Sequence, residues 1–168
     1  GLVGSEMCIR DSITKDMPGL NFNADNEDPD FDDRSDNKGP EPEALTIGKV
    51  GDRTYAFIGA ERVGGIFVYD VTTPAEAKFV TYVNNRDFSV GYDEDDVAAT
   101  TKAGDLGPEG LAFVPAADSP TDDALLIAGN EVSGTTTVFS VKDLLADASD
   151  NTDSPTASGS SDGSSNSS

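Results

Sequence analysis

The stretch that decides the fold runs from Arg34 to Val71, RSDNKGPEPEALTIGKVGDRTYAFIGAERVGGIFVYDV, because part of it returns later in the chain. Pro42-Glu43-Ala44-Leu45 returns 66 residues on as Pro108-Glu109-Gly110-Leu111. Six further residues return 70 residues on: Gly59, Glu61, Gly64, Val68, Tyr69 and Val71 match Gly129, Glu131, Gly134, Val138, Phe139 and Val141. The difference of four residues fits a longer loop at Ala116–Asp123. A repeat of this kind predicts one supersecondary unit that is used twice.

Each copy of the repeat is a series of short apolar runs separated by Gly and Pro turn signals, which is typical of antiparallel strands. The predicted strands are residues 44–47, 54–60, 66–71 and 78–83 in the first copy, and 110–114, 124–129 and 135–141 in the second. Residues 142–146 start either a fourth strand or a short helical turn. Four such strands in about 40 residues describe one propeller blade. We therefore predict an all-β fold, a β-propeller fragment of about two four-stranded antiparallel blades with a disordered C-terminal tail.

The two ends of the chain differ from these repeats. Residues 2–12, LVGSEMCIRDS, resemble a translated sequencing adapter of the transposase type, so they are excluded from fold reasoning and Cys8 is taken as foreign. The natural protein is then expected to extend further upstream, with this chain as its C-terminal fragment. The last residues carry too little apolar surface to offset the entropy of ordering them. The predicted segments are 1–12 (adapter artefact), 13–38 (acidic loop), 39–90 (first blade), 91–106 (acidic loop), 107–146 (second blade) and 147–168 (disordered spacer).

Composition restricts the partners and the chemistry. The 168 residues include 32 acidic and 11 basic ones, a formal net charge of −21, which disfavours nucleic acid and anionic membranes as partners because both would be repelled. Histidine is absent, so the chain holds no Ser-His-Asp machinery and no imidazole zinc site. No apolar run approaches the roughly 20 residues of a membrane-spanning helix. Any bound metal must take oxygen ligands, which favours calcium or magnesium over a transition metal, and calcium is the candidate ion.

Acidic residues are dense before the first strand, where Asp28, Asp30 and Asp32 follow an alternating spacing. An EF-hand would need Gly and Glu at the sixth and twelfth positions of such a loop, and these positions hold Asp33 and Gly39. An EF-hand is therefore excluded. A less regular calcium site and a plain solvated loop both stay open, and the candidate ligands here are Asp32, Asp33 and Asp36.

Four glutamates occupy repeated positions and form the second group of metal candidates: Glu43, Glu61, Glu109 and Glu131. Glu43 and Glu109 precede the first strand of their units, the strand that lines the central channel of a propeller. Recurrence around one axis could assemble an oxygen-ligand cation site. The alternative is that the Pro-Glu pair is a structural turn whose carboxylate accepts backbone amides, because repeated positions usually serve the fold.

Two arginines stand out in so acidic a chain, Arg62 and Arg86. A guanidinium group can clamp a phosphate with two parallel hydrogen bonds, so both are candidate ligand-binding residues. The alternative is that each neutralises a neighbouring carboxylate, such as Glu61 or Asp87.

Four runs carry a family resemblance: residues 34–43 (RSDNKGPEPE), 55–65 (YAFIGAERVGG), 82–88 (YVNNRDF) and 129–136 (GNEVSGTT). Together they resemble the C-terminal part of the choice-of-anchor I family, over about residues 31–141. The resemblance implies a secreted or surface β-propeller protein of bacteria, similar to proteins named mesenchyme-specific cell surface glycoprotein, alkaline phosphatase or phytase-like. It brings no catalytic residue to this chain. The predicted spacer resembles the segment that precedes the varied anchors of that family.

The predicted function is an extracellular or cell-surface β-propeller module for binding or scaffolding, without catalysis in this fragment. Its expected partners are cations or surface components. The alternative is a calcium-dependent phosphoester hydrolase of which this chain is the C-terminal part.

Overall fold

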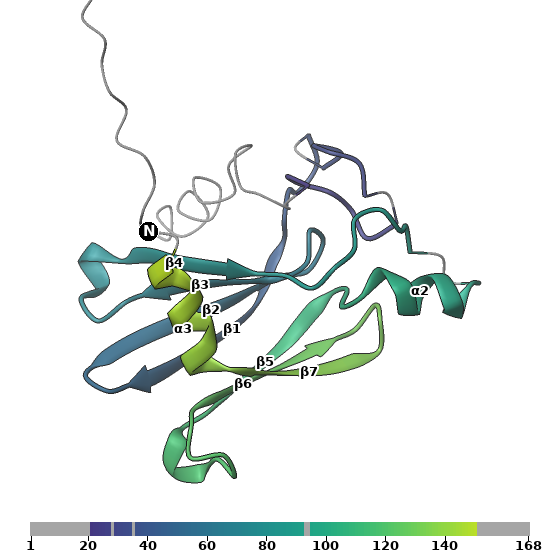
Figure 1. Ribbon diagram of the computed structural model, residues 1–168. Helices are drawn as coiled ribbons and strands as arrows, with labels where there is room; N and C mark the ends of the chain where they lie inside the picture. Colours follow the sequence, from purple (N-terminus) through teal and green to yellow (C-terminus); the bar gives the residue numbers. More distant parts are fainter. Residues whose placement is uncertain (1–20, 28, 35, 93–94, 151–168) are drawn as a thin grey trace, which may run out of the picture.

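The structure is a computed structural model and describes residues 21–27, 29–34, 36–92 and 95–150 (Figure 1). Its strands are β1 (Pro42–Val50), β2 (Arg53–Ala60), β3 (Ile66–Asp70), β4 (Lys78–Val83), β5 (Pro108–Val114), β6 (Leu125–Asn130) and β7 (Thr135–Ser140). Its helical elements are α2 (Val97–Ala103), α3 (Val141–Asp150) and the short 3-10 turns η1 (Pro74–Glu76) and η2 (Ala116–Asp118). None of the helices in this described part is long and apolar enough to cross a membrane.

The strands form two antiparallel sheets in chain order, β1-β2-β3-β4 and β5-β6-β7. Figure 1 shows the sheets as two layers, with the first strand of each, β1 and β5, on the side where the sheets meet. Every predicted strand overlaps an observed one. The prediction of an all-β architecture is therefore confirmed as two antiparallel sheets. Neither sheet closes on itself, and the propeller stays a prediction.

Burial follows the period of two that a strand imposes on its side chains. Ile66 and Val68 point from β3 toward the second sheet, where they share a core with Leu126 of β6. Phe67 and Tyr69 point to the opposite side and belong to a second apolar cluster. The first sheet is thus apolar on both faces, as expected for a sheet that is covered on both sides.

The second sheet corrects one prediction, because it has three strands and not four. After Ser140 the chain continues as α3, the helical alternative for residues 142–146. Val141 and Leu144 lie three residues apart on one face of this helix, and both are buried in the core between the sheets. Since α3 runs to Asp150, the first residues of the predicted spacer are helical. Residues 151–168 lie outside the described part of the chain, as do residues 1–20.

A second difference is the helix α2, which lies within the predicted acidic loop 91–106. Asp96 caps its N-terminus, because its side chain accepts hydrogen bonds from the amides of Ala98 and Ala99. The extra residues of the second copy lie where the repeat offsets place them, in the connection between β5 and β6 that contains η2.

The two sheets approach closely at Gly48 of β1. A Cβ atom at this position would lie 2.2 Å from a ring carbon of Phe113 in β5. The Phe113 ring stacks in turn on Phe57 of β2, with ring centroids 5.9 Å apart and an angle of 21° between the ring planes. Glycine at residue 48 therefore makes room for an aromatic contact that joins the sheets.

We expect Gly48→Ala to lower the free energy of unfolding by about 1–3 kcal/mol, because the added methyl group would overpack the interface and displace the Phe113 ring. Gly110→Ala in β5 is the matched control, since a Cβ there meets nothing within 4 Å. Urea melts followed by circular dichroism measure both. Equal stability of the Gly48→Ala variant and the wild type would contradict the close approach, whereas partial recovery in the Gly48→Ala, Phe113→Leu double variant would support it.

Candidate functional site

A glutamate stands at the same backbone irregularity in both sheets. The pairing of β1 with β2 changes register around Glu43, and the pairing of β5 with β6 changes register around Glu109. Such a bulge leaves one residue without a partner in the ladder and turns its side chain in a new direction. The repeated Pro-Glu pair therefore fixes a backbone feature, and that feature aims the two carboxylates.

The other two repeated glutamates are placed by matching hydrogen bonds. The amide of Glu61, just after β2, donates to the carbonyl of Glu41 at 2.8 Å, and the amide of Glu131, just after β6, donates to the carbonyl of Gly107 at 2.8 Å. Both acceptor residues have a left-handed backbone, with φ of 47° at Glu41 and 70° at Gly107. The two units thus share the backbone conformation and the hydrogen bonds at these positions, as well as the glutamate side chains.

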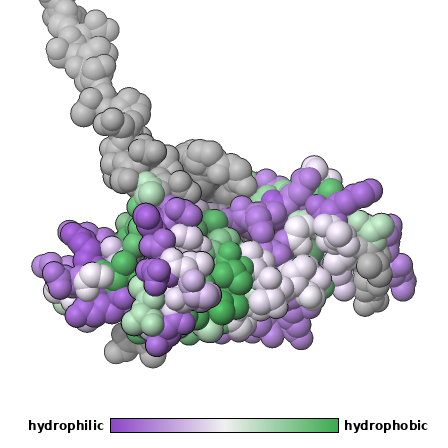
Figure 2. Space-filling model, turned by 60° about the horizontal axis from the view of Figure 1, so that its bottom comes forward, coloured by the Kyte–Doolittle hydropathy of each residue, from purple (hydrophilic) through white to green (hydrophobic). Residues whose placement is uncertain are grey.

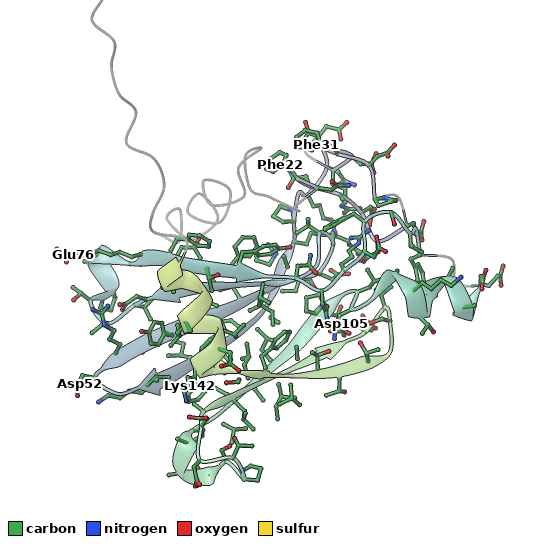
Figure 3. The ribbon with its side chains drawn as sticks, viewed as in Figure 1. Phe22, Phe31, Asp52, Glu76, Asp105 and Lys142 are labelled. Carbon is green, nitrogen blue, oxygen red and sulfur yellow. The ribbon has the colours of Figure 1, made fainter. Side chains whose placement is uncertain are left out.

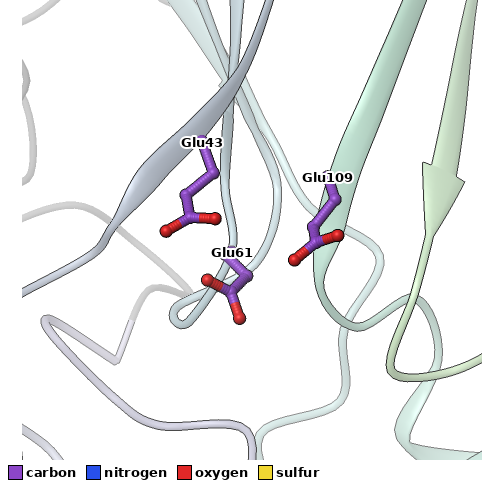
Figure 4. A group of neighbouring side chains, drawn as sticks. All are labelled: Glu43, Glu61 and Glu109. Carbon is purple, nitrogen blue, oxygen red and sulfur yellow. The ribbon is translucent and has the colours of Figure 1, made fainter.

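Three of these glutamates converge where the sheets meet (Figure 4). Carboxylate oxygens of Glu43, Glu61 and Glu109 all lie within 4.8 Å of one another. Glu61 is buried, whereas Glu43 and Glu109 are exposed and leave the cluster open to solvent. We call Glu43, Glu61, Glu109 and the neighbouring Glu131 the carboxylate cluster.

The carboxylates of the cluster repel one another, and this repulsion helps to raise the pKa values of Glu61 and Glu109. Burial raises the pKa of Glu61, and the nearby carboxylates of Glu43, Glu41 and Glu131 add to this rise, while Arg62 opposes it. A hydrogen bond with the Glu131 carboxyl raises the pKa of Glu109, and repulsion from Glu131 and Glu61 acts in the same direction. Raised values of this kind mean that the folded protein gains from holding a proton, or another positive charge, at this place.

The predicted site residues divide into two groups in the structure. The repeated glutamates are brought together, as the offsets of the repeat indicated. Asp32, Asp33 and Asp36 are not members of the group of Glu43, Glu61 and Glu109 and are exposed in the loop before β1. The candidate calcium site in the loop before β1 and the candidate site at the repeated glutamates are thus separate groups, and calcium binding stays a prediction for each.

A buried ionic network lies beside the cluster, and only its Arg62–Glu61 pair was anticipated from the sequence, as the alternative to a phosphate clamp. Its centre is the carboxylate of Glu41, which is 7% exposed. Glu41 accepts from Arg34 at 3.0 Å and from Arg62 at 2.6 Å, and Lys38 lies 3.0 Å away. Arg62 also pairs with Glu61 at 3.0 Å, so one guanidinium joins the network to the carboxylate cluster. The sequence signal was weak, since Glu41 is one of several acidic residues in its loop.

The second candidate arginine, Arg86, is held by the main chain. It is 7% exposed, and its Nη1 donates to the carbonyl of Arg62 at 3.0 Å. Its other amino group donates to the carbonyl of Asn26 at 3.3 Å, and its guanidinium lies 4.7 Å from the centre of the Phe88 ring. Arg86 therefore ties the loop before β1 to the turn after β2. In the same loop the Phe22 and Phe31 rings lie 5.9 Å apart (Figure 3).

A polar network involving Asp105 lies between α2 and the second sheet (Figure 3). Its carboxylate accepts from Thr135 at 2.6 Å, from Asn85 at 2.6 Å and from Thr137, and these hydrogen bonds lower the pKa of Asp105 against the opposing effect of burial. Three donors engage this carboxylate, so it serves to join the segment before β5 to β7 and to the end of β4.

Comparison with known proteins supports the family resemblance. The model of the choice-of-anchor I domain matches residues 8–74, which confirms the resemblance over that stretch. The match begins at Cys8, inside the segment interpreted as an adapter, and that interpretation stays a prediction. A curated relative, Gigasin-3a of Magallana gigas, is 28% identical over 113 residues, which cover 67% of this chain and 40% of the relative. The chain thus spans well under half the length of this relative. No solved structure matches it.

The raised pKa of Glu109 gives a prediction for the metal-free protein. The unfolded chain releases this proton near the usual value of 4.5, but the folded chain releases it at higher pH. Stability is therefore lost as the pH rises through this window, and the loss persists at neutral pH. We expect Glu109→Gln to raise the Tm at pH 7 in the presence of a chelator, and the gain to vanish at a pH well below 4.5.

The matched control is Glu76→Gln, which removes the same charge from the exposed turn η1, away from the cluster. Thermal melts at a series of pH values measure both variants. A lower Tm for Glu109→Gln at neutral pH, or an equal rise for both variants, would contradict repulsion within the cluster.

Proposed function

We propose, from the choice-of-anchor I match over residues 8–74, that this chain is part of an extracellular or cell-surface β-propeller module for binding or scaffolding. We further propose that its carboxylate cluster binds a divalent cation, with calcium as the preferred ion. The observation that carries the second proposal is the convergence of Glu43, Glu61 and Glu109 within 4.8 Å.

The chemistry of the cluster suits a hard cation. Carboxylate oxygens are the ligands that calcium prefers, and calcium accepts irregular sets of six to eight oxygens, including water. The two exposed members, Glu43 and Glu109, leave an open side through which water could complete the coordination. A bound dication would replace repulsion among the carboxylates by attraction, and it would join β1 of the first sheet to β5 of the second.

The propeller proposal is supported by the arrangement of the sheets. Each unit is an antiparallel meander, the sheets share an apolar core, and β1 and β5 are neighbours. Adjacent blades of a propeller have this relation, with the first strands nearest the axis. The cluster lies at one end of these two strands, which is the mouth of the channel in such an arrangement.

Calcium binding is tested by thermal shift and calorimetry on the whole chain. We expect added CaCl2 to raise the Tm by mass action, with a dissociation constant in the range of about 10⁻⁴–10⁻³ M that is common for extracellular sites. The double variant Glu43→Gln, Glu109→Gln should lose the shift, and Glu76→Gln should keep it. A calcium shift that survives in the double variant would place the ion elsewhere.

The hydrolase alternative needs a separate test, because the contacts of Arg62 and Arg86 do not decide whether either residue takes part in catalysis. Arg62 is engaged by Glu41 and Glu61, and Arg86 by main-chain carbonyls. We expect the full-length protein to release no product from a chromogenic phosphate ester, with or without calcium. Calcium-dependent turnover that is lost in the Glu43→Gln, Glu109→Gln variant would favour the hydrolase over the binding module.

A further inference from the structure

The contact between the sheets uses different faces of the two units. We call face A the side of a sheet that carries Phe57 and Val68 in the first unit, and face B the opposite side. In the observed interface, face A of the first sheet packs against face B of the second, which contributes Leu126, with Leu111 and Phe113 at its border. The interface is therefore heterologous, like a head-to-tail contact between subunits.

The repeat supplies the same two faces a second time. Phe57 and Val68 on face A correspond to Ile127 and Val138 of the second unit, 70 residues on. Phe57 and Val68 are both 0% exposed, whereas Val138 is 57% exposed. The alternating burial along β6 leaves Ile127 on the outer side of the second sheet. Face A of the second unit thus carries apolar residues that no described part of the chain covers fully.

Face B of the first unit is open in a corresponding way. Leu111 and Phe113, which border the observed interface, correspond to Leu45 and Ile47, 66 residues earlier. Leu45 is 63% exposed and Ile47 is 59% exposed. Farther from β1, Phe67 and Tyr69 of this face are covered by other side chains, so the open part of face B is the strip along β1. Figure 2 shows apolar side chains reaching the surface between hydrophilic regions.

We infer that face A of the second unit binds face B of the first unit in a second copy of this chain, in the arrangement that joins the two units within one chain. The argument is continuity with the interface already present, because Leu45 and Ile47 correspond to its border residues on face B, and Ile127 and Val138 correspond to its face A residues. Ala56, the counterpart of Leu126, is already buried. In place of the stacked Phe57 and Phe113 rings, Ile127 of one copy would meet Ile47 of the next. The same arrangement would bring Glu109 of one copy toward Glu43 of the next, as the two residues meet within one chain. The inference is argued from the apolar faces alone and does not rest on cation binding.

Electrostatics opposes this association and gives it a characteristic salt dependence. Each chain carries a formal net charge of −21, and copies repel one another at low ionic strength. Salt screens repulsion between exposed charges over distances beyond the Debye length, about 10 Å at 0.1 M. Apolar contacts are not weakened in this way. Association by the open faces should therefore strengthen as salt is added.

Complementary variants test the head-to-tail geometry. Val138→Lys blocks face A of the second unit, and Ile47→Lys blocks face B of the first, with Leu45→Lys as a second face B variant. Light scattering after gel filtration, with a reductant to exclude disulfides through Cys8, should show association for the wild type in high salt. Each variant alone should behave as one chain. An equimolar mixture of Val138→Lys and Ile47→Lys should form pairs, because each variant keeps the face that the other lacks.

Thr73→Lys is the charge-matched control, since Thr73 is exposed beside η1 and lies on neither open face. It should associate like the wild type. Each lysine lowers the net negative charge, so loss of association in the blocked variants cannot come from added repulsion. Circular dichroism and a cooperative melt check that the variants fold. A monomeric wild type in high salt, association of a blocked variant alone, or a mixture that stays monomeric would overturn the inference.

Discussion

The burial of one apolar face against another is the constraint on which the rest of this structure depends. Phe57, Val68 and Leu126 are withdrawn from water only because the two sheets pack together. Full burial of a side chain of this size contributes about 1.5–3 kcal/mol. The glycine at residue 48 is needed for the same contact, since it admits the Phe113 ring. The positions of β1 and β5, and hence of the glutamates at their ends, follow from this packing.

Much of the fold could be predicted from the sequence because it is local or repeated. The alternation of Ile66, Phe67, Val68 and Tyr69 shows which residues share a face, and the repeat offsets locate the longer connection between β5 and β6. The helix α3 was left open between two alternatives. The repeat favoured a strand there, but Val141 and Leu144 fit a helix that covers the edge of the core. Tertiary packing decided the outcome.

The candidate site was predictable to the extent that it repeats. Equivalent positions in two packed units must come close to a common axis, so the grouping of Glu43, Glu61 and Glu109 was accessible from the offsets alone. The contacts of Glu41 with Arg34 and Arg62 were not, because they depend on how the loop before β1 folds against the turn after β2. Nor could the sequence reveal that Arg86 would be buried and bonded to carbonyl groups. Such pairings depend on the path of the loop before β1.

The bulge at Glu43 and Glu109 has a consequence for any assembly of such units around an axis. Each unit with this bulge adds a carboxylate to the same place, and the number of repelling pairs grows nearly as the square of the number of units, whereas the apolar contacts grow only in proportion to it. Like charges held this close repel one another, although exposure to water weakens the repulsion between Glu43 and Glu109. A closed ring therefore requires compensating charge at its axis, from an arginine such as Arg62, from retained protons or from a cation. The same small backbone irregularity thus gathers negative charge at the axis of any ring built from such units.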